Sequence, residues 1–364
     1  MTMDERLYWL WLAGVLGYAA KETGTLLDVY GDAEGVFLAR DFEDFSTLLR
    51  QPQIQRMHTL EPESFAPVLA RCDELGIQVV TWADQEYPMD FLRIPDAPPV
   101  LYCTGDIAVL NHHCRVSMVG SRRPSVYGVE AARVLADGLA EAGVILVSGL
   151  ADGLDSEAHK ASVRADAETI AVLGNTIDET YPPGNRGLRA QIEQRGVVIS
   201  EYGPGAGRSP NFFLQRNRLI AALGDVLCVV EARQKSGTMS TVHHARRYGR
   251  RVYAVPGSIF SNLSEGTNQL IADEEARPVL NAATLLRAIG RPPEGLSITR
   301  PAGGPVPPTP EDAAVLEQFG ARPMTFDALY KAAGLGVGEL LAALTRLGLG
   351  GHIVALAGRR YQRR

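Results

Sequence analysis

The spacing of hydrophobic positions changes along the chain, and each change predicts a different part of the structure. Over residues 1–65, apolar side chains recur at helical spacing and Gly or Asp stands at the joints, which predicts a small helical module. Residues 75–105 contain two short apolar runs on either side of a loop punctuated by proline. These runs predict two strands that lead into the next domain.

A longer stretch with a different rhythm follows. Apolar runs rich in β-branched residues lie at 115–120, 144–149, 168–174, 196–201, 225–232 and 250–257. Helical patterns lie between them, near 128–142, 155–165, 186–195, 214–223 and 238–248. Strands that are apolar along their whole length and alternate with helices predict a parallel sheet buried on both faces. The fold class is therefore α/β, and ligands of such sheets bind beyond the carboxyl ends of the strands.

The end of the chain departs from this rhythm. Residues 291–310 are dense in Pro and Gly without an apolar period, which predicts a linker. Residues 311–364 predict three short helices and a pair of strands, the outline of a winged helix. Its expected recognition helix has only three polar side chains, Glu339, Thr345 and Arg346. A helix that reads bases presents several such groups, so we expect protein contacts or weak backbone contacts instead.

Charge is distributed unevenly around a formal net charge of −6. Residues 1–105 hold 7 Lys and Arg against 17 Asp and Glu, a net charge of −10, whereas residues 186–251 hold 12 against 4, a net charge of +8. A basic region of this kind attracts a polyanion although the whole chain is acidic. Nucleic acid is therefore a candidate ligand, and scattered arginines on a solvated face are the alternative.

The composition bears on the cellular compartment and on the kinds of site that the chain can form. No apolar run reaches the roughly 18 residues of a membrane helix, and the acidic, helically spaced start predicts a folded helix rather than a signal peptide. The four cysteines form no close pair, so neither a disulfide framework nor a metal site is expected. We expect a cytoplasmic protein with no metal, no cofactor and no membrane contact.

The expected strand ends carry the candidate chemistry. Gly120-Ser121-Arg122-Arg123 combines a close backbone approach with arginines that can hold phosphates in bidentate fashion. In Ser148-Gly149-Leu150-Ala151, successive N–H groups and the following helix N-terminus favour a phosphate. Neither loop has the spacing of a dinucleotide fingerprint or a Walker loop, which argues against nicotinamide or ATP.

Two later segments repeat this chemistry. Lys235-Ser236-Gly237-Thr238 adds a cation to a small-residue turn, and Arg216-Asn217-Arg218 is expected to open a helix. Phe212 and Phe213 precede that cluster, and we expect at least one of them to be core. Cations that follow phosphates, with aromatic rings that stack on bases, are typical of single-stranded nucleic-acid binding.

Catalytic constellations are poor. Glu201 and Glu231 end strands, and we expect them to be buried in pairs with nearby arginines. The histidines at 159, 243 and 244 lie on predicted helices without metal-ligand partners at useful spacing. The sequence therefore predicts phosphate binding without a catalytic group.

Seven segments form a specific set: SMVGSRRPSVYG, VSGLADGLDSEAHKASV, TIAVLGNTIDETYPPGN, ISEYGPG, FFLQRNRLIAAL, VVEARQKSGTMSTVHHARRYGR and VYAVPGSIFSNLSEGTNQLI. With this set, the chain resembles the DNA-processing protein A (DprA, or Smf) family from about residue 75 to about residue 280. The resemblance implies four parts: a small all-α, SAM- or helix-hairpin-like module (1–70), an extended Rossmann-like domain (71–290), a linker (291–310) and a winged-helix-like domain (311–364).

The resemblance also implies a function. It implies binding of single-stranded DNA without sequence preference, and loading of the recombinase RecA onto strands covered by single-strand-binding protein, in natural transformation (competence) and recombination. It implies a homodimer without known catalytic activity, and it leaves duplex DNA open. The residues and the resemblance together give the expected DNA-binding set: Gly120, Ser121, Arg122, Arg123, Ser148, Gly149, Ala151, Asn185, Arg186, Arg208, Arg216, Asn217, Arg218, Lys235, Ser236, Gly237 and Thr238.

Two other classes of function stay open. An enzyme that acts on nucleoside phosphates, similar to the lysine-decarboxylase-like phosphoribohydrolases, would carry a Pro-Gly-Gly-x-Gly-Thr turn followed by a catalytic Glu. Here the turn at 236–241 has no Glu in that place, which disfavours this alternative. A winged-helix transcription factor is disfavoured because the expected recognition helix has few polar side chains.

Overall fold

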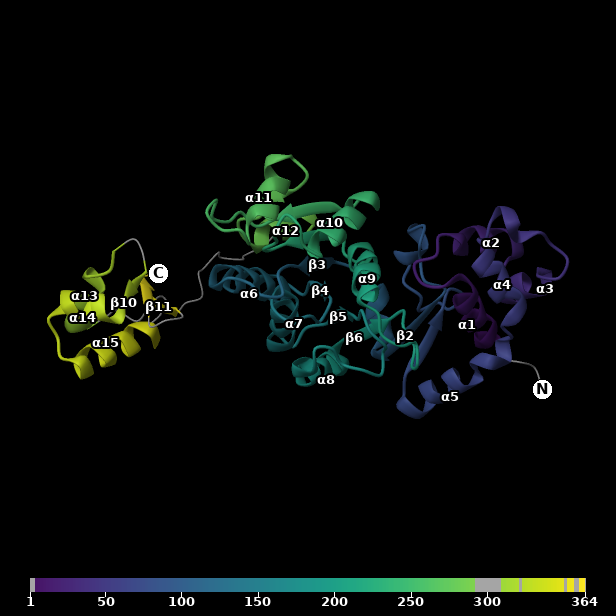
Figure 1. The fold of residues 1–364 in the computed structure, drawn as a ribbon, viewed down its shortest axis with the longest axis horizontal. Coiled ribbons are helices and arrows are strands. Elements are labelled where there is room, and N and C mark those ends of the chain that lie inside the picture. The colour runs from purple at the N-terminus through teal and green to yellow at the C-terminus, as the bar shows by residue number, and fades with distance from the viewer. Residues whose placement is uncertain (1–3, 292–308, 321–322, 350–351, 357–359, 364) are drawn as a thin grey trace. The chain divides into compact units, whose positions relative to one another are not determined.

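The computed structural model describes residues 4–291, 309–320, 323–349, 352–356 and 360–363. The chain forms two compact units, Met1–Glu294 and Gly295–Arg364. The first unit holds the helical start and the α/β domain, and the second holds the predicted winged helix (Figure 1). Most of the predicted linker lies outside the described residues.

Five α-helices form the start of the first unit: α1 (Glu5–Leu16), α2 (Glu22–Tyr30), α3 (Ala33–Ala39), α4 (Gln51–Thr59) and α5 (Ala66–Leu75). The helical spacing predicts the first four, and α5 follows the stretch 1–65 in which that spacing was found. The carboxylates of Asp4 and Asp32 accept backbone N–H bonds and so fix where α1 and α3 begin. Trp11 is fully buried and packs edge-on against Phe37, with 5.1 Å between ring centroids. The same core includes Tyr102 of the sheet, so these helices and the sheet share one hydrophobic core.

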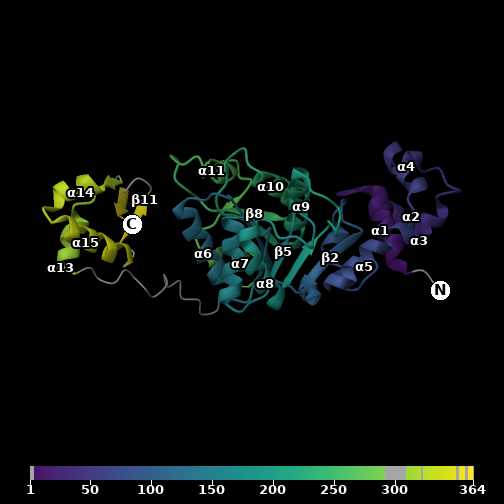
Figure 2. The same cartoon turned by 60° about the horizontal axis from the view of Figure 1, so that its bottom comes forward.

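Nine strands of the described region form one sheet in the order β1-β2-β6-β5-β4-β3-β7-β8-β9. In Figure 2 the labelled strands of this sheet follow one another from β2 through β5 to β8. They are β1 (Gln78–Thr81), β2 (Val100–Gly105), β3 (Arg115–Val119), β4 (Ile145–Ser148), β5 (Thr169–Val172), β6 (Val197–Ser200), β7 (Val226–Val229), β8 (Arg251–Ala254) and β9 (Arg277–Pro278). Strands β3 to β9 pair in parallel, and β1 and β2 add an antiparallel edge. The eight predicted strands are confirmed, whereas β9 has two residues and is too short for a hydrophobic pattern to show.

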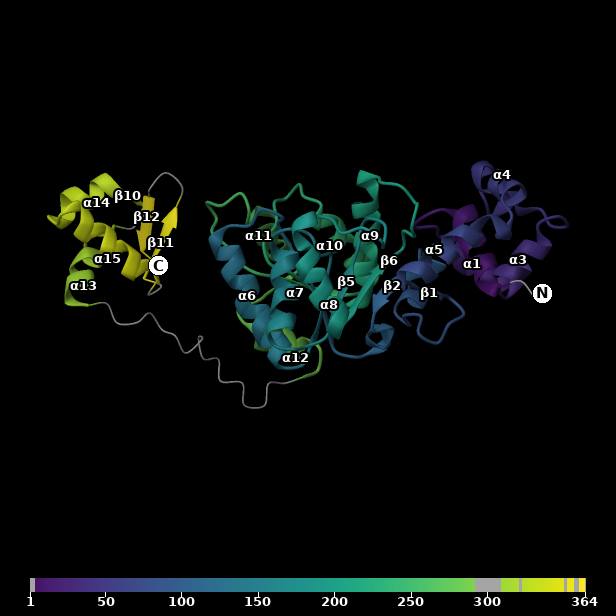
Figure 3. The same cartoon turned by 90° about the horizontal axis from the view of Figure 1, so that it is seen from below.

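Helices cover both faces of this sheet. One face carries α6 (Val126–Glu141), α7 (Leu154–Arg164) and α12 (Ala282–Ala288), and the other carries α9 (Pro210–Leu223), α10 (Thr238–Arg247) and α11 (Glu265–Ala272). Side chains of β7 alternate between the two cores, Val226 and Cys228 on the α6 side and Leu227 and Val229 on the α9 side. Helix α8 (Arg186–Arg195) lies beside α7 (Figure 3).

One helix starts earlier than predicted. Helix α9 begins at Pro210 rather than near 214, because the Ser209 hydroxyl caps it and Pro210 suits the first helical position. The cluster Arg216-Asn217-Arg218 therefore lies in the second and third turns of α9, and the prediction that it opens the helix is wrong.

The strand order reverses at β3. Strands β4, β5 and β6 follow one another on one side of β3, and β7, β8 and β9 on the other. In open α/β sheets the crevice at the carboxyl ends of the strands, where the order reverses, is the usual ligand site. This topology points to the loops after β3 and β7.

The second unit has the predicted winged-helix outline. Its described elements are α13 (Pro310–Glu317), β10 (Met324–Thr325), α14 (Phe326–Ala333), α15 (Val337–Leu349), β11 (Ile353–Leu356) and β12 (Arg360–Arg363). The polar groups of α15 serve this unit itself. Glu339 accepts the N–H of Gly336 at 2.9 Å, and Thr345 donates to a carbonyl one turn back. Arg346 forms an ion pair with Asp312 at 2.8 Å.

No single helix in the described part of the chain is long and apolar enough to cross a membrane. The helix pair Phe326–Ala333 and Val337–Gly348, bent by 111°, meets the criteria of length and composition only when taken together.

Candidate nucleic-acid interface

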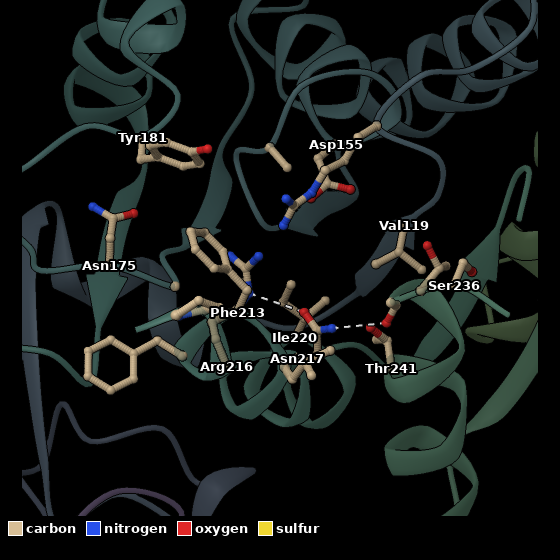
Figure 4. Close-up of a pocket in the computed structure, with 18 of the residues that line it drawn as sticks. Val119, Asp155, Asn175, Tyr181, Phe213, Arg216, Asn217, Ile220, Ser236 and Thr241 are labelled. Atoms are coloured by element: carbon tan, nitrogen blue, oxygen red, sulfur yellow. Dashed lines mark hydrogen bonds between the residues drawn. The ribbon is translucent and has the colours of Figure 1, made fainter. Parts of the chain in front are cut away.

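A cavity of about 1130 Å³ opens at the carboxyl ends of β3, β4, β5 and β7, where the strand order reverses (Figure 4). Its walls are the loops after these strands and one side of α9. Eleven of the seventeen expected DNA-binding residues line it: Gly120, Ser121, Arg122, Ala151, Arg186, Arg208, Arg216, Asn217, Ser236, Gly237 and Thr238. The tertiary fold thus brings together residues from separate segments of the chain.

The loop after β3 is held in place by the segments that follow β7 and β4. The Ser121 N–H donates to the Glu231 carbonyl at 2.8 Å, and the Leu154 N–H donates to the Ser121 carbonyl at 3.2 Å. Gly153 has a φ of +80°, and a Cβ there would lie 2.9 Å from the carbonyl carbon of Arg122. Only glycine fits this approach, which fixes the backbone that presents Arg122 to the cavity.

Three exposed arginines line the cavity without an ion-pair partner among the described residues: Arg122, Arg186 and Arg233. Arg208 also lines it but is paired with Glu179 at 2.9 Å. Arg186 is the first residue of α8, where a cation is unfavourable beside the positive end of the helix dipole. That placement is reasonable if the arginine and the helix N-terminus share an anionic ligand.

Aromatic rings form one wall of the cavity. Tyr181 is 52% exposed and lies 5.5 Å from Phe213 between ring centroids, and the two mark one side of the cavity in Figure 4. The guanidinium carbon of Arg122 stands 5.1 Å from the centre of the Phe213 ring. Phe212 also lines the cavity and stacks on Tyr202 at 3.9 Å. Both phenylalanines are half-buried, so the prediction that at least one of them is core is wrong. The wall offers ring faces next to a cation.

Arg216 forms the floor of the cavity and is only 3% exposed. Its Nη1 donates to the Gly149 carbonyl at 2.9 Å and to the carbonyl of Val172. Burial lowers the pKa of Arg216 to about 10, so the side chain is still charged at neutral pH. Burial raises the pKa of the neighbouring Asp155, although Arg216 opposes that change. The floor therefore carries a desolvated cation, whose field is stronger than in water.

The opposite side of the cavity joins α9 to the loop before α10. The Asn217 amide donates to the Gly237 carbonyl at 3.2 Å and to the Ser240 hydroxyl at 2.8 Å. The Ser236 hydroxyl oxygen is buried without a hydrogen-bond partner among the described residues. These contacts hold the loop 235–238 against the arginine floor, with a hydroxyl at the cavity that no described residue engages.

Six expected residues do not line the cavity. Arg123 and Lys235 are exposed beside it. The Asn185 amide donates to the Leu150 carbonyl at 2.9 Å and so ties the start of α8 to the loop after β4, while Gly149 lies against Arg216. The side chains of Ser148 and Arg218 are 0% and 1% exposed, so protein atoms close both off from a ligand.

The two strand-end glutamates have different partners. Glu201 accepts from Arg218 at 2.8 Å in a buried ion pair, which confirms that part of the prediction. Glu231 instead accepts from the N–H of Ser125 at 2.8 Å and from its hydroxyl at 2.6 Å. The prediction of an arginine partner for Glu231 is therefore wrong, because Ser125, 106 residues away in sequence, comes next to it at the start of α6.

Sequence reasoning missed some of the lining residues. Arg233 was not singled out, although it stands two residues before Lys235 at the same strand end. Asp178 and Glu179 follow β5 and put carboxylates on a basic cavity. All three residues follow a predicted strand, and that position could have indicated them. The net charge of the cavity was not predictable in this way, because it depends on the ion pair between Glu179 and Arg208.

The chain is similar to known protein families, to curated relatives and to solved structures. The family described as DNA recombination-mediator protein A matches residues 78–290, and the DprA winged helix domain matches residues 299–359. Protein Smf of Synechocystis sp. is 31% identical over 401 residues, covering 100% of both chains. DNA processing protein DprA of Streptococcus pneumoniae is 40% identical over 190 residues, covering 52% of this chain and 67% of the relative.

Two solved structures are similar in fold and sequence. The X-ray structure of DprA from Streptococcus pneumoniae has a TM-score of 0.68 at 31% identity and covers 79% of this chain and 98% of its own. The structure of DprA from Helicobacter pylori, described for its single-stranded DNA binding mode, has a TM-score of 0.52 at 33% identity. It covers 58% of this chain and 94% of its own.

Proposed function

Because the chain belongs to the DNA recombination-mediator protein A family, we propose that it binds single-stranded DNA without sequence preference and loads RecA onto it. The Helicobacter pylori relative is described for binding single-stranded DNA, and its fold resembles this one. In this proposal, RecA is loaded onto strands covered by single-strand-binding protein. The protein acts as a cytoplasmic homodimer, without a cofactor and without a catalytic step.

The observation that carries the proposal is that one cavity combines ring faces with arginines that form no ion pair among the described residues. Arg122, Arg186 and Arg233 supply charge for phosphates, and Tyr181 and Phe213 supply surfaces on which bases stack. Single-stranded nucleic-acid sites combine these two features, because every nucleotide has a phosphate and a base with two faces. The same features account for binding without sequence preference.

The size and position of the cavity favour a strand over one nucleotide. Its volume, about 1130 Å³, lies above the roughly 300–1,000 Å³ of pockets that hold one small ligand. The unpaired arginines follow three different strands, β3, β5 and β7, so their charges are spread along the sheet edge. A run of phosphates matches that spread better than one phosphate group does.

The second unit supports the same proposal. The polar side chains of α15 are bonded within their own unit, Arg346 to Asp312 among them. Little is left for hydrogen bonds to base edges, which are the basis of direct sequence readout. We propose that this unit contacts protein or the nucleic-acid backbone, and that the DNA-binding residues are those around the cavity.

Titration of labelled oligo-dT and of a mixed-sequence strand by fluorescence anisotropy tests the DNA-binding part. We expect similar affinities for the two strands and a steep loss with added salt, since phosphate contacts release counterions. We expect Arg122→Ala to weaken both strands equally, because its contact is to phosphate rather than to a base edge. An affinity that depends neither on salt nor on Arg122 would contradict the proposal.

The mediator step has its own test. RecA and single-strand-binding protein are mixed with a DNA circle, and ATP hydrolysis by RecA reports filament formation. We expect this protein to shorten the lag before RecA begins to hydrolyse ATP. With the Arg122→Ala variant in its place, we expect the longer lag to return. Release of a free base from nucleoside monophosphates would instead support the phosphoribohydrolase-like alternative, although Glu231 is engaged by Ser125 and the turn 236–241 has no Glu.

A further inference from the structure

The tip of the loop between β8 and α11 is apolar and takes no part in the hydrophobic core. Ile259 and Phe260 stand at this tip and are 82% and 90% exposed. The tip is ordered by its own backbone bonds, from the Ser261 N–H to the Ser258 carbonyl at 3.0 Å and from the Ser264 N–H to the Ser261 carbonyl at 2.9 Å. Two large apolar side chains, adjacent in sequence, are thus held in water by a structured turn; single exposed apolar side chains are ordinary, whereas an adjacent exposed pair marks a candidate contact site.

This loop is built onto the wall of the cavity. The Gly266 N–H, at the start of α11, donates to the Ala232 carbonyl at 2.9 Å, and a Cβ on Gly266 would lie 2.9 Å from the carbonyl carbon of Arg233. Ala232 and Arg233 themselves line the cavity. Because β8 pairs in parallel with β7, the loops after the two strands leave the sheet at the same edge. The tip therefore stands beside the cavity, one strand further along.

A second exposed ring supports the base of the loop. Tyr127, 51% exposed, lies in the first turn of α6 and donates its hydroxyl hydrogen to the Pro256 carbonyl at 2.6 Å. It follows the loop that carries Arg122 and Arg123, so this bond joins the loops after β3 and β8. In Figures 1 to 3, α6 and α11 both lie at the end of the sheet away from β2.

The charges around the tip indicate which part of a nucleotide it would meet. Arg123, Arg233 and Lys235 are exposed on the neighbouring loops and form no ion pair among the described residues. At the tip itself the nearest charge in sequence is Glu265, exposed in the first turn of α11. A carboxylate repels a phosphate, so the cations would follow the backbone while the apolar tip faces the bases.

We propose that Phe260, with Ile259 beside it and Tyr127 at its base, is a second base-stacking contact for a DNA strand that leaves the cavity towards β8. This inference rests on the proposed function, because it extends the path of the same single strand. A phenylalanine face stacks on any base, which is consistent with binding without sequence preference. This contact increases the number of nucleotides that the protein binds and leaves the phosphate contacts in the cavity unchanged.

Phe260→Ala tests the contact, and Phe42→Ala is the matched control, since Phe42 is 88% exposed on the acidic helical part of the chain. Anisotropy is measured with oligo-dT of about 4 and about 16 nucleotides. For Phe260→Ala we expect the Kd of the long strand to rise roughly tenfold, with an unchanged salt dependence and little change for the short strand. Phe42→Ala should match the unsubstituted protein, and Phe260→Trp should keep the affinity and lose tryptophan fluorescence when oligo-dT binds.

Each result has one reading. If Phe260→Ala binds the long strand as Phe42→Ala does, while Arg122→Ala still weakens it, the proposed contact is wrong and the proposed function stands. If neither Phe260→Ala nor Arg122→Ala changes DNA binding, the proposed function itself is wrong, and the inference that rests on it is wrong as well. A Phe260→Ala protein that binds DNA normally but fails to load RecA would assign the tip to a protein partner and overturn the inference.

Discussion

Arg186 offers a sharp test of the cavity, because its effect on binding and its effect on stability have opposite signs. It is exposed, unpaired among the described residues, and begins α8 at the cavity. A cation in the first turn of a helix opposes the helix dipole, so Arg186→Ala should leave the free energy of unfolding unchanged or raise it by about 0.3–1 kcal/mol. Weaker DNA binding by this variant cannot then be ascribed to poorer folding.

The magnitude follows from the charges at the cavity. A hydrogen bond to a charged group contributes about 1.5–3 kcal/mol, and the exposure of Arg186 favours the lower figure, which corresponds to a roughly tenfold rise in Kd. Each phosphate contact to a single strand contributes about −0.7 to the slope of log K against log salt. Arg122, Arg186 and Arg233 of the cavity therefore contribute about −2 to this slope, and removal of Arg186 should make the slope less steep by about 0.7.

Arg195→Ala is the control, because Arg195 ends the same helix, about 13 Å from Arg186 at 1.5 Å per residue. It forms an ion pair with Asp166 at 2.8 Å and does not line the cavity. Anisotropy titrations of oligo-dT at several salt concentrations, with urea unfolding of each variant, supply both numbers. Equal affinities and equal salt slopes for Arg186→Ala and Arg195→Ala would refute the assignment of Arg186 to DNA binding.

Three further predictions concern the framework of the cavity. Gly149→Ala should lower the free energy of unfolding, measured in urea, by about 1–3 kcal/mol and weaken DNA binding, because its Cβ would lie 2.5 Å from Arg216 Nη2. Its control is Gly187→Ala, in open space on α8, which should raise the free energy of unfolding by about 0.5–1 kcal/mol. Glu201→Ala should lower the free energy of unfolding by about 3–5 kcal/mol, because it leaves the buried Arg218 without its carboxylate partner. A decrease of less than about 1 kcal/mol would contradict this prediction. Burial lowers the pKa of His159 to about 3 from an ordinary 6.5, so His159 is protonated at a higher pH in the unfolded chain than in the folded protein. The free energy of unfolding should therefore fall as the pH drops from about 6.5 towards about 3. The urea midpoint of His159→Gln should vary less with pH in that window, and an equal variation would show that His159 does not titrate as its burial implies.

The sequence determined the elements and the edge of the sheet where the chemistry lies. Strands and helices of the α/β domain follow from local periodicity, which depends only on neighbours along the chain, and eight strands were predicted for that reason. Glycines and arginines directly after strands indicated the ligand edge, since parallel strands place their carboxyl ends together. The shared core between the helical start and the sheet was not predictable, because it depends on contacts between distant segments.

Only the tertiary structure decided what each charged side chain does. Arg216 and Arg218 are two residues apart on α9, yet one forms the cavity floor and the other pairs with Glu201. Positions two apart on a helix point in different directions, and what each meets is set by loops remote in sequence. The same reason separates Glu201 from Glu231, whose partner Ser125 is 106 residues away. Residue type and position after a strand located the site, whereas burial and pairing, which depend on the packed fold, decided which of its cations stay free for a ligand.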